Sequence, residues 1–474
     1  MKNLKTFLDT YAMLIVKKGV NVQQGDLIQL DISVNQAPLA RLIVQKAYKL
    51  GASQVILRWT DDVILREHVS HMALSALQHV PVYKQDEMSD LVHRRISRIS
   101  VVSQDPGVFS DIATERIKVY QQYDRNLLFG IRQVAAANKI SWTVVAAAEA
   151  SWAAKVFPDL NPKDQVDALW DAIFKATKVY EDDPIAAWSL HEQKLKEKAD
   201  KMNRAQFIAL HYQAPGTDLT IGLPRNHVWV SAGNVNEKGF AFMANMPTEE
   251  IFTAPDCRAA DGVVSTTKPL AYAGHVITGI QLTFKDGEIV KVKADQGEDV
   301  LKSLIAMDKG SKHLGEVALV PDPSPISQSG ITFFNTLYDE NASNHLAIGN
   351  AYAFNINRGV DMTEEDLIAN GLNRSKNHVD FMIGSNSMNI DGILQEVVLQ
   401  SFEKEQLIRW NLLLDYAATN RFSISSHGEK SKSVISLRLS LYNAETTSIP
   451  LIVVAAVYVD WKLFPYGSFP FTCR

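Results

Sequence analysis

Cysteine and long apolar runs are both scarce in this chain of 474 residues. Its two cysteines, Cys257 and Cys473, stand far apart, which excludes a disulfide framework and a thiolate metal site. The amino terminus has one basic flank and no uninterrupted apolar stretch behind it, so it is a poor signal peptide. The apolar run at 449–459 is about half as long as a membrane-spanning helix. We therefore expect a soluble, cytoplasmic protein with no membrane partner.

A strong charge of one sign is also lacking. The formal net charge is −5 and both signs are interspersed, so the sequence predicts no nucleic-acid partner. Apolar residues make up 46% and charged residues 21% of the chain, which is typical of a folded soluble protein. The chain is too long for one ordinary core, and its length predicts two domains with an appendage.

The first half of the chain alternates strand and helix patterns. A strand at 26–33, a helix at 37–50 closed by Gly51 and a strand at 53–59 predict a βαβ unit with parallel strands. Two further strands are predicted at 98–103 and 140–147. No glycine-rich phosphate loop opens the first helix, since residues 33–36 contain no glycine. Nucleotide binding is therefore disfavoured for this half.

The second half has a different texture. Residues 162–203 are helical in pattern and heavily charged, which predicts a solvated helical bridge. Short strands follow, and a tight turn at 285–288 predicts a hairpin between two of them. The predicted strands span residues 207–212, 218–223, 275–284 and 289–294. The fold class is therefore α/β, with an amino-terminal α/β domain at 1–205 built on a mostly parallel sheet and a β-rich α+β catalytic domain at 206–395.

Residues suited to chemistry collect in this second domain. Glu249 and Glu250 are adjacent, and neighbouring residues of a strand point to opposite faces, so at most one of them faces a site. Glu316 stands at the head of an apolar strand. The alternation at 378–381 places His378 and Asp380 on one face of a strand. His345 and Tyr352 lie between these segments, in a stretch that also contains Glu340.

This residue set favours a metal site. Carboxylates in an apolar strand are costly to bury unless a positive charge neutralises them. Imidazole and carboxylate together suit Zn²⁺, Co²⁺ or Mn²⁺. Three acids and two histidines exceed what one tetrahedral ion uses, which argues for two ions that share a bridging carboxylate.

Each residue also has a structural interpretation when it is taken alone. His345 and His378 can each be a satisfied structural histidine, and Glu316 can be a salt-bridge partner. Tyr352 can be half-buried with a bonded hydroxyl, and Asp380 can cap a turn. The spacing forms no compact metal-binding motif, so the residues by themselves leave these interpretations open beside the metal site.

Several long phrases resemble the aminopeptidase T/aminopeptidase S family of dinuclear metalloaminopeptidases, also called thermophilic aminopeptidases. The phrases lie in order along the chain, and the resemblance extends from the start to about Gln395. They occupy residues 245–256, 314–320, 338–349, 377–384 and 390–392. The resemblance implies removal of amino-terminal residues from peptides with a free amino terminus, two divalent ions per subunit and a homodimer. The ions expected are Zn²⁺ or Co²⁺, with Mn²⁺ and Mg²⁺ as alternatives.

Carried onto matching positions, the resemblance implies six metal ligands, with Glu316 as the bridging carboxylate. These are Glu250, Glu316, His345, Tyr352, His378 and Asp380. Glu316 and Tyr352 are thus expected to take part in catalysis as well as in binding. Glu340 is our candidate for the carboxylate that moves the proton of the attacking water. Its alternative role is to fix the tautomer of His345.

The resemblance stops before residues 396–474. This atypical tail has serine-rich and aromatic-rich patches without sustained periodicity. Three interpretations are open, namely an extra module, a fused segment or translation out of frame, and the texture favours the last. Two alternatives therefore accompany the expected aminopeptidase. The first is a catalytically impaired relative that lacks its closing strand, and the second is another dinuclear hydrolase, such as a phosphatase or an amidohydrolase.

Overall fold

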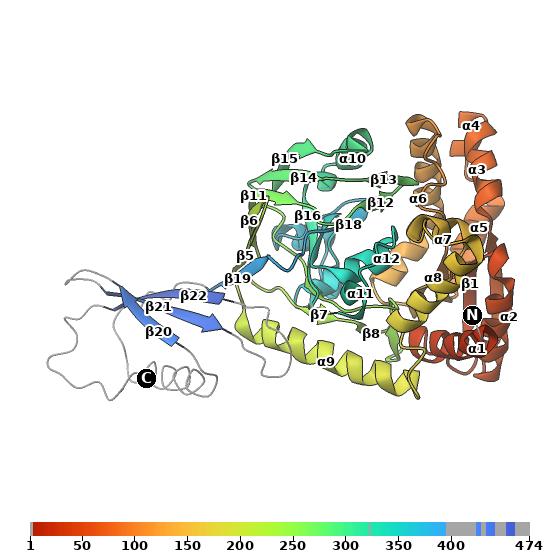
Figure 1. Cartoon of the computed structure of the whole chain (residues 1–474), viewed down its shortest axis with the longest axis horizontal. Helices are drawn as coiled ribbons and strands as arrows, with labels where there is room; N and C mark the ends of the chain where they lie inside the picture. The colour runs from red at the N-terminus through yellow and green to blue at the C-terminus, as the bar shows by residue number, and fades with distance from the viewer. Residues whose placement is uncertain (1–2, 322–323, 395–422, 428–432, 441–451, 460–474) are drawn as a thin grey trace.

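A computed structural model describes residues 3–321, 324–394, 423–427, 433–440 and 452–459. It has a parallel sheet with helices at the amino terminus, followed by a strand-rich region (Figure 1). The fold class expected from the sequence is therefore confirmed. Within the described residues, no helix is long and apolar enough to cross a membrane. Most of the tail predicted at 396–474 lies outside the described residues.

The amino-terminal sheet has four parallel strands in the order β2-β1-β3-β4. They span Leu27–Ser33 (β1), Gln54–Thr60 (β2), Ser97–Val102 (β3) and Trp142–Ala146 (β4). Helix α2 (Ala37–Lys49) connects β1 to β2, and Gly51 ends it at a φ of 104°, a conformation that glycine adopts without strain. The predicted βαβ unit is thus confirmed.

Helices cover both faces of this sheet (Figure 1). Ile28 and Leu30 of β1 pack in one core with residues of α1 and α2, whereas Trp142 of β4 packs against residues of α5 and α6. Besides α2, the α-helices of this region are α1 (Leu4–Leu14), α3 (Asp62–His71), α4 (Leu74–Gln78), α5 (Val82–His93), α6 (Thr114–Ala136) and α7 (Ala150–Val156).

The bridge predicted as one helical stretch consists of two helices, α8 (Pro162–Ala176) and α9 (Pro184–Ala205). Lys178, between them, has a φ of 59°, which interrupts helical geometry. The Asp183 carboxylate then accepts from the first free backbone N–H groups of α9. Helix α9 also buries one side, including Trp188, so it is not solvated all round.

The larger sheet of the strand-rich region has the order β15-β14-β11-β6-β5-β19-β22-β21-β20. Its strands are β5 (Ala209–Ala214), β6 (Thr217–Gly222), β11 (Ala260–Ser265), β14 (Gln281–Lys285), β15 (Glu288–Lys293), β19 (Asn389–Ile393), β20 (Ser423–His427), β21 (Ser433–Ser440) and β22 (Ile452–Val459). Asp286 and Gly287 both have positive φ, which confirms the predicted hairpin between β14 and β15.

One strand prediction in this region is wrong. The stretch expected as a single strand at 275–284 is β13 (His275–Ile277) followed by β14, because Gly279 between them has a φ of 62°. Strand β13 pairs instead with β12 (Leu270–Tyr272) in a separate hairpin.

The smaller sheet is antiparallel and has the order β18-β17-β16-β10-β7. Its strands are β7 (Val230–Ser231), β10 (Ile251–Thr253), β16 (Leu314–Leu319), β17 (His345–Gly349) and β18 (His378–Met382). Leu346, Ile348 and Val379 pack into the main core from one face of this sheet. Since side chains alternate along a strand, the opposite face is free to carry polar groups.

The remaining strands and α-helices of the described residues are short. They are β8 (Gly233–Val235), β9 (Ala241–Met243), α10 (Glu298–Ile305), α11 (Pro325–Gln328), α12 (Thr336–Asp339) and α13 (Glu364–Ala369).

Candidate metal centre

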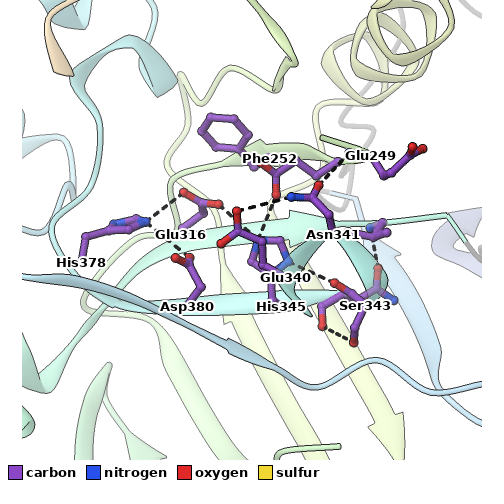
Figure 2. Close-up of polar contacts among 12 residues, drawn as sticks. Glu249, Phe252, Glu316, Glu340, Asn341, Ser343, His345, His378 and Asp380 are labelled. Carbon is purple, nitrogen blue, oxygen red and sulfur yellow. Dashed lines mark hydrogen bonds and ion pairs between the residues drawn. The ribbon is translucent and has the colours of Figure 1, made fainter. Parts of the chain in front are cut away.

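Five of the six predicted ligands meet on the polar face of the smaller sheet. They form two groups in which every ligand atom lies within 4.8 Å of the others, and Glu316 belongs to both. Figure 2 shows the Glu316 carboxylate between the two histidines. His345 Nε2 lies 3.6 Å from Glu316 Oε1, and His378 Nε2 lies 3.3 Å from Glu316 Oε2. Each oxygen of this carboxylate thus faces a different group.

Glu250 and Asp380 complete the two groups. Glu250 Oε2 lies 2.9 Å from His345 Nε2, and Asp380 Oδ1 lies 3.4 Å from His378 Nε2. The predicted shared face of His378 and Asp380 is therefore present in the structure. The two groups are Glu250, Glu316 and His345, and Glu316, His378 and Asp380.

Strand register brings these residues together. Ala347 of β17 is paired with Glu316 on one side and with Asp380 on the other. Its side chain is fully buried and small, so the face between the two carboxylates is left open. A register shift between Leu314 and Glu316 aims Glu316 at this face. Gly315 lies at the shift, where a side chain would collide with the Gly349 and Asn350 carbonyl oxygens.

Backbone carbonyls fix both imidazole rings. His345 Nδ1 lies 3.0 Å from the Ser343 carbonyl oxygen, and His378 Nδ1 lies 2.7 Å from that of Asn350. A carbonyl oxygen only accepts, so Nδ1 donates in each ring and Nε2 faces the carboxylates. This is the orientation in which a neutral histidine offers Nε2 to a cation. The alternative role of Glu340, fixing the tautomer of His345, is wrong because the Ser343 carbonyl does so.

Burial and mutual charge perturb the whole set. Burial lowers the pKa of His345, but Glu250 and Glu316 outweigh it and raise that pKa well above its ordinary value. Burial raises the pKa of Glu250, and the His345 side chain only partly offsets this. Burial raises the pKa of Asp380, but His378, together with His345, outweighs it and holds the pKa of that carboxyl below its ordinary value.

The donor set fits divalent cations. With Glu340, four carboxyl groups converge here on only two imidazoles, and Glu250, Glu316 and Glu340 are all buried. Glu250 Oε2 and Asp380 Oδ1 are buried, and among the described residues they have no hydrogen-bond donor when both histidines are neutral with the proton on Nδ1. Buried charge of one sign is unfavourable unless a cation neutralises it, and imidazole with carboxylate suits Zn²⁺, Co²⁺ or Mn²⁺.

Tyr352 and Glu340 border the two groups. The Tyr352 ring centre lies 5.0 Å from that of His378. The charge of His378 lowers the pKa of Tyr352, but burial and the nearby carboxylates outweigh it and raise that pKa to about 12. Burial, then the charges of Asp380 and Glu250, raise the pKa of Glu340 well above its ordinary value. Asn341 Nδ2 approaches Glu340 Oε1 at 3.4 Å (Figure 2).

Glu249 faces away from the centre, as the alternation along the strand predicts. Its carboxylate lies 3.6 Å from Lys178 Nζ and 3.5 Å from His191 Nε2, so α9 and the segment before it contact the strand that follows Glu250. The Asn341 Oδ1 atom accepts the Glu249 backbone N–H at 2.7 Å. Sequence reasoning missed these partners. The signal that could have indicated Lys178 and His191 is Glu249 itself, because a buried acid requires a counter-charge.

Comparison with known proteins now identifies the family. The model of the thermophilic metalloprotease (M29) family matches residues 4–403. The chain belongs to this family. Among its relatives, aminopeptidase PepS of Streptococcus thermophilus is 55% identical over 394 residues, which are 83% of this chain and 95% of that protein. Aminopeptidase AmpS of Bacillus subtilis is 51% identical over 393 residues, 83% of this chain and 96% of that protein.

A solved structure supports the fold. Wild-type AmpT from Thermus thermophilus superposes with a TM-score of 0.76 at 36% identity, covering 82% of this chain and 95% of that one. The expected family is confirmed, and so is the class of metalloprotease with aminopeptidase relatives. The domain boundaries, individual ligands, number and identity of the ions, homodimer and cytoplasmic location stay predictions.

Proposed function

We propose that this M29 protein is an aminopeptidase that removes amino-terminal residues from peptides with two divalent cations, Zn²⁺ or Co²⁺. The observation that carries the proposal is the pair of ligand groups that share Glu316. Glu250 and His345 would hold one cation with Glu316, and His378 and Asp380 would hold the other. Tyr352, beside His378, would complete the second group. The aminopeptidases among the relatives support a substrate with a free amino terminus.

When bound, such cations supply Lewis acidity, which makes water a nucleophile near neutral pH and polarises a carbonyl oxygen. The residues of the chain supply the proton transfers. Glu340 is buried beside both groups, a position from which its carboxylate would carry a proton from the attacking water to the departing amine. The Asn341 amide orients the Glu340 carboxylate through its Nδ2 atom, and its Oδ1 atom accepts the Glu249 backbone N–H.

The test compares activities before and after cation removal. Chelated protein, reloaded with Co²⁺ or Zn²⁺, is assayed with leucyl-p-nitroanilide and with p-nitrophenyl phosphate, and bound metal is counted by atomic emission. We expect release of p-nitroaniline only, dependent on about two cations per chain. Phosphate release alone would favour a different dinuclear hydrolase. Cation binding without any turnover would favour the impaired relative.

The Glu316→Gln variant tests the shared ligand. We expect loss of activity by about a hundred- to a thousandfold and weakened binding of both cations, with the fold retained. Glu298→Gln, at a partly exposed position in the first turn of α10, removes the same charge outside the two ligand groups and is the matched control. Full turnover by Glu316→Gln with unchanged metal content would contradict the assignment.

We also propose, from the family resemblance, that the protein acts as a homodimer in the cytoplasm. Sedimentation equilibrium of the full chain tests the first point. A single species at the mass of one chain over the working concentration range would exclude the homodimer.

A further inference from the structure

Three aromatic rings stand beside the candidate metal centre and form what we call the aromatic wall: Phe252, Tyr352 and Phe354. The Tyr352 and Phe354 rings are stacked, with centres 5.1 Å apart and planes 7° apart. The Phe252 ring meets both edge-on, at 6.3 Å from Tyr352 and 6.1 Å from Phe354. Such geometry is favourable for aromatic pairs and makes one apolar surface of three separate side chains.

The aromatic wall is continuous with the ligands. Phe252 is two residues after Glu250, so both side chains leave the chain on the same face of the smaller sheet. Phe252 is paired with Ala318, which is two residues after Glu316 on that face. Figure 2 shows Phe252 among the residues of the centre. Tyr352 reaches His378 from the other end of the wall.

The rings are held in place by the segment around them. The Asn355 amide Nδ2 donates to the carbonyl oxygens of Val228 at 3.2 Å and Phe252 at 3.4 Å. The segment that carries Phe354 rests on a small apolar cluster that includes Ala351 and Ile356. The wall is therefore positioned before any substrate arrives, which reduces the entropy that binding must remove.

All three rings are only partly buried, whereas the ligands Glu250, Glu316 and His345 are buried. In a peptide, the side chain of the first residue branches from the carbon atom between the free amine and the scissile carbonyl. If that carbonyl reacts at the centre, this side chain must lie within one residue's reach of the ligands. The partly exposed wall supplies an apolar surface at that position.

We propose that the aromatic wall binds the side chain of the first residue of the substrate and favours large apolar or aromatic residues there. This inference rests on the proposed aminopeptidase function. It assigns Phe252 and Phe354 as specificity-determining residues and leaves chemistry to the ligands and Glu340. Small first residues bind the same centre without this contact and are cleaved less efficiently.

The Phe354→Ala variant of the full, metal-loaded chain tests the proposal with phenylalanyl-, leucyl- and alanyl-p-nitroanilides. We expect the ratio of kcat/KM between the phenylalanyl and alanyl substrates to fall by about tenfold, and Phe354→Leu to restore part of it. Calorimetry gives a second readout. The affinity for free phenylalanine falls in Phe354→Ala, whereas the affinity for free alanine changes less. The Phe252→Ala variant should shift the same ratio.

Phe129→Ala is the matched control, since Phe129 is 57% exposed on α6 and lies outside the centre. It should change neither the ratio nor the metal content. Equal losses for all three substrates in both wall variants, with metal content retained, would overturn the aromatic wall as a specificity site. Absence of turnover on every anilide in the unmodified protein would instead refute the proposed function. The calorimetric affinities for free phenylalanine and alanine would then still decide whether the aromatic wall binds apolar side chains.

Discussion

We predict that one small residue, Ala347, keeps space for cations between the two proposed groups of ligands. Ala347 is fully buried and is paired with Glu316 on one neighbouring strand and with Asp380 on the other. Residues directly opposite in antiparallel strands have Cβ atoms about 5 Å apart. The Ala347→Val variant adds two methyl groups between the Glu316 and Asp380 carboxylates. These carboxylates would hold a cation in the proposed site, so the added atoms crowd it.

Two magnitudes follow from this crowding. Overfilling a packed position costs about 1–3 kcal/mol in the free energy of unfolding. Metal ligands tolerate displacements of only about 0.2 Å, and disturbing their support lowers metal affinity by about 10–100-fold. That decrease corresponds to about 1.4–2.7 kcal/mol of binding free energy. The affinity is measured by competition with a chromophoric chelator, and stability by urea unfolding of the metal-free protein.

Ala146→Val separates these two effects. Ala146 is also fully buried but lies in β4 of the amino-terminal sheet, so the same atoms are added away from the ligands. We expect both variants to lose stability and only Ala347→Val to lose metal affinity. Our placement of the cations would be refuted if Ala347→Val bound two cations as tightly as the unmodified protein.

Two further predictions concern buried acids near the centre. Glu249, held by Lys178 and His191, fixes the segment that carries Glu250, so Glu249→Ala should lower metal affinity by about tenfold. Glu249→Gln should recover most of the loss. Equal affinities of Glu249→Ala and the unmodified protein in a calorimetric titration would contradict this role. Burial raises the pKa of Asp339 from 3.8 to about 6, and the Phe333 and Asn335 N–H groups only partly offset it. The folded protein therefore binds the Asp339 proton more tightly than the unfolded chain does. The resulting contribution to the free energy of unfolding, about 3 kcal/mol, is complete below pH 3.8 and is lost as pH rises through about 6. In urea unfolding of metal-free protein, the unmodified protein should lose free energy of unfolding relative to Asp339→Asn as the pH rises from 4 to 7. A difference that stays constant over this range would contradict the raised pKa of Asp339.

Local signals in the sequence explain which parts of the fold were predictable. The βαβ unit and the hairpin at Asp286 and Gly287 depend on periodicity and turn chemistry within about thirty residues. The breaks at Lys178 and Gly279 were not predicted, because each adopts a positive φ that neighbouring residues do not require. Helical or strand-like composition continues on both sides of these breaks.

In the candidate metal centre too, relations within one strand were predictable and relations between distant segments were not. Alternation placed His378 and Asp380 on one face and separated Glu249 from Glu250, because these relations lie within one strand. The partners of Glu249 were not predictable, since Lys178 and His191 are brought to it only by the packing of α9 and the segment before it against the smaller sheet. Selection of Glu316 as the shared ligand required the resemblance, and the structure supplies its geometry.

Register explains why distant segments yield one centre. Five of the proposed ligands lie on or next to strands β10, β16, β17 and β18, and a shift by one residue would move those of a strand to the opposite face. Leu346 and Ile348 alternate with His345 and Ala347 and pack into the main core, so a slip would expose them and bury the polar set in apolar surroundings. The free energy of burying these apolar side chains therefore also fixes the positions of the ligands. The proposed metal centre thus depends also on the apolar residues of β17 that face the core.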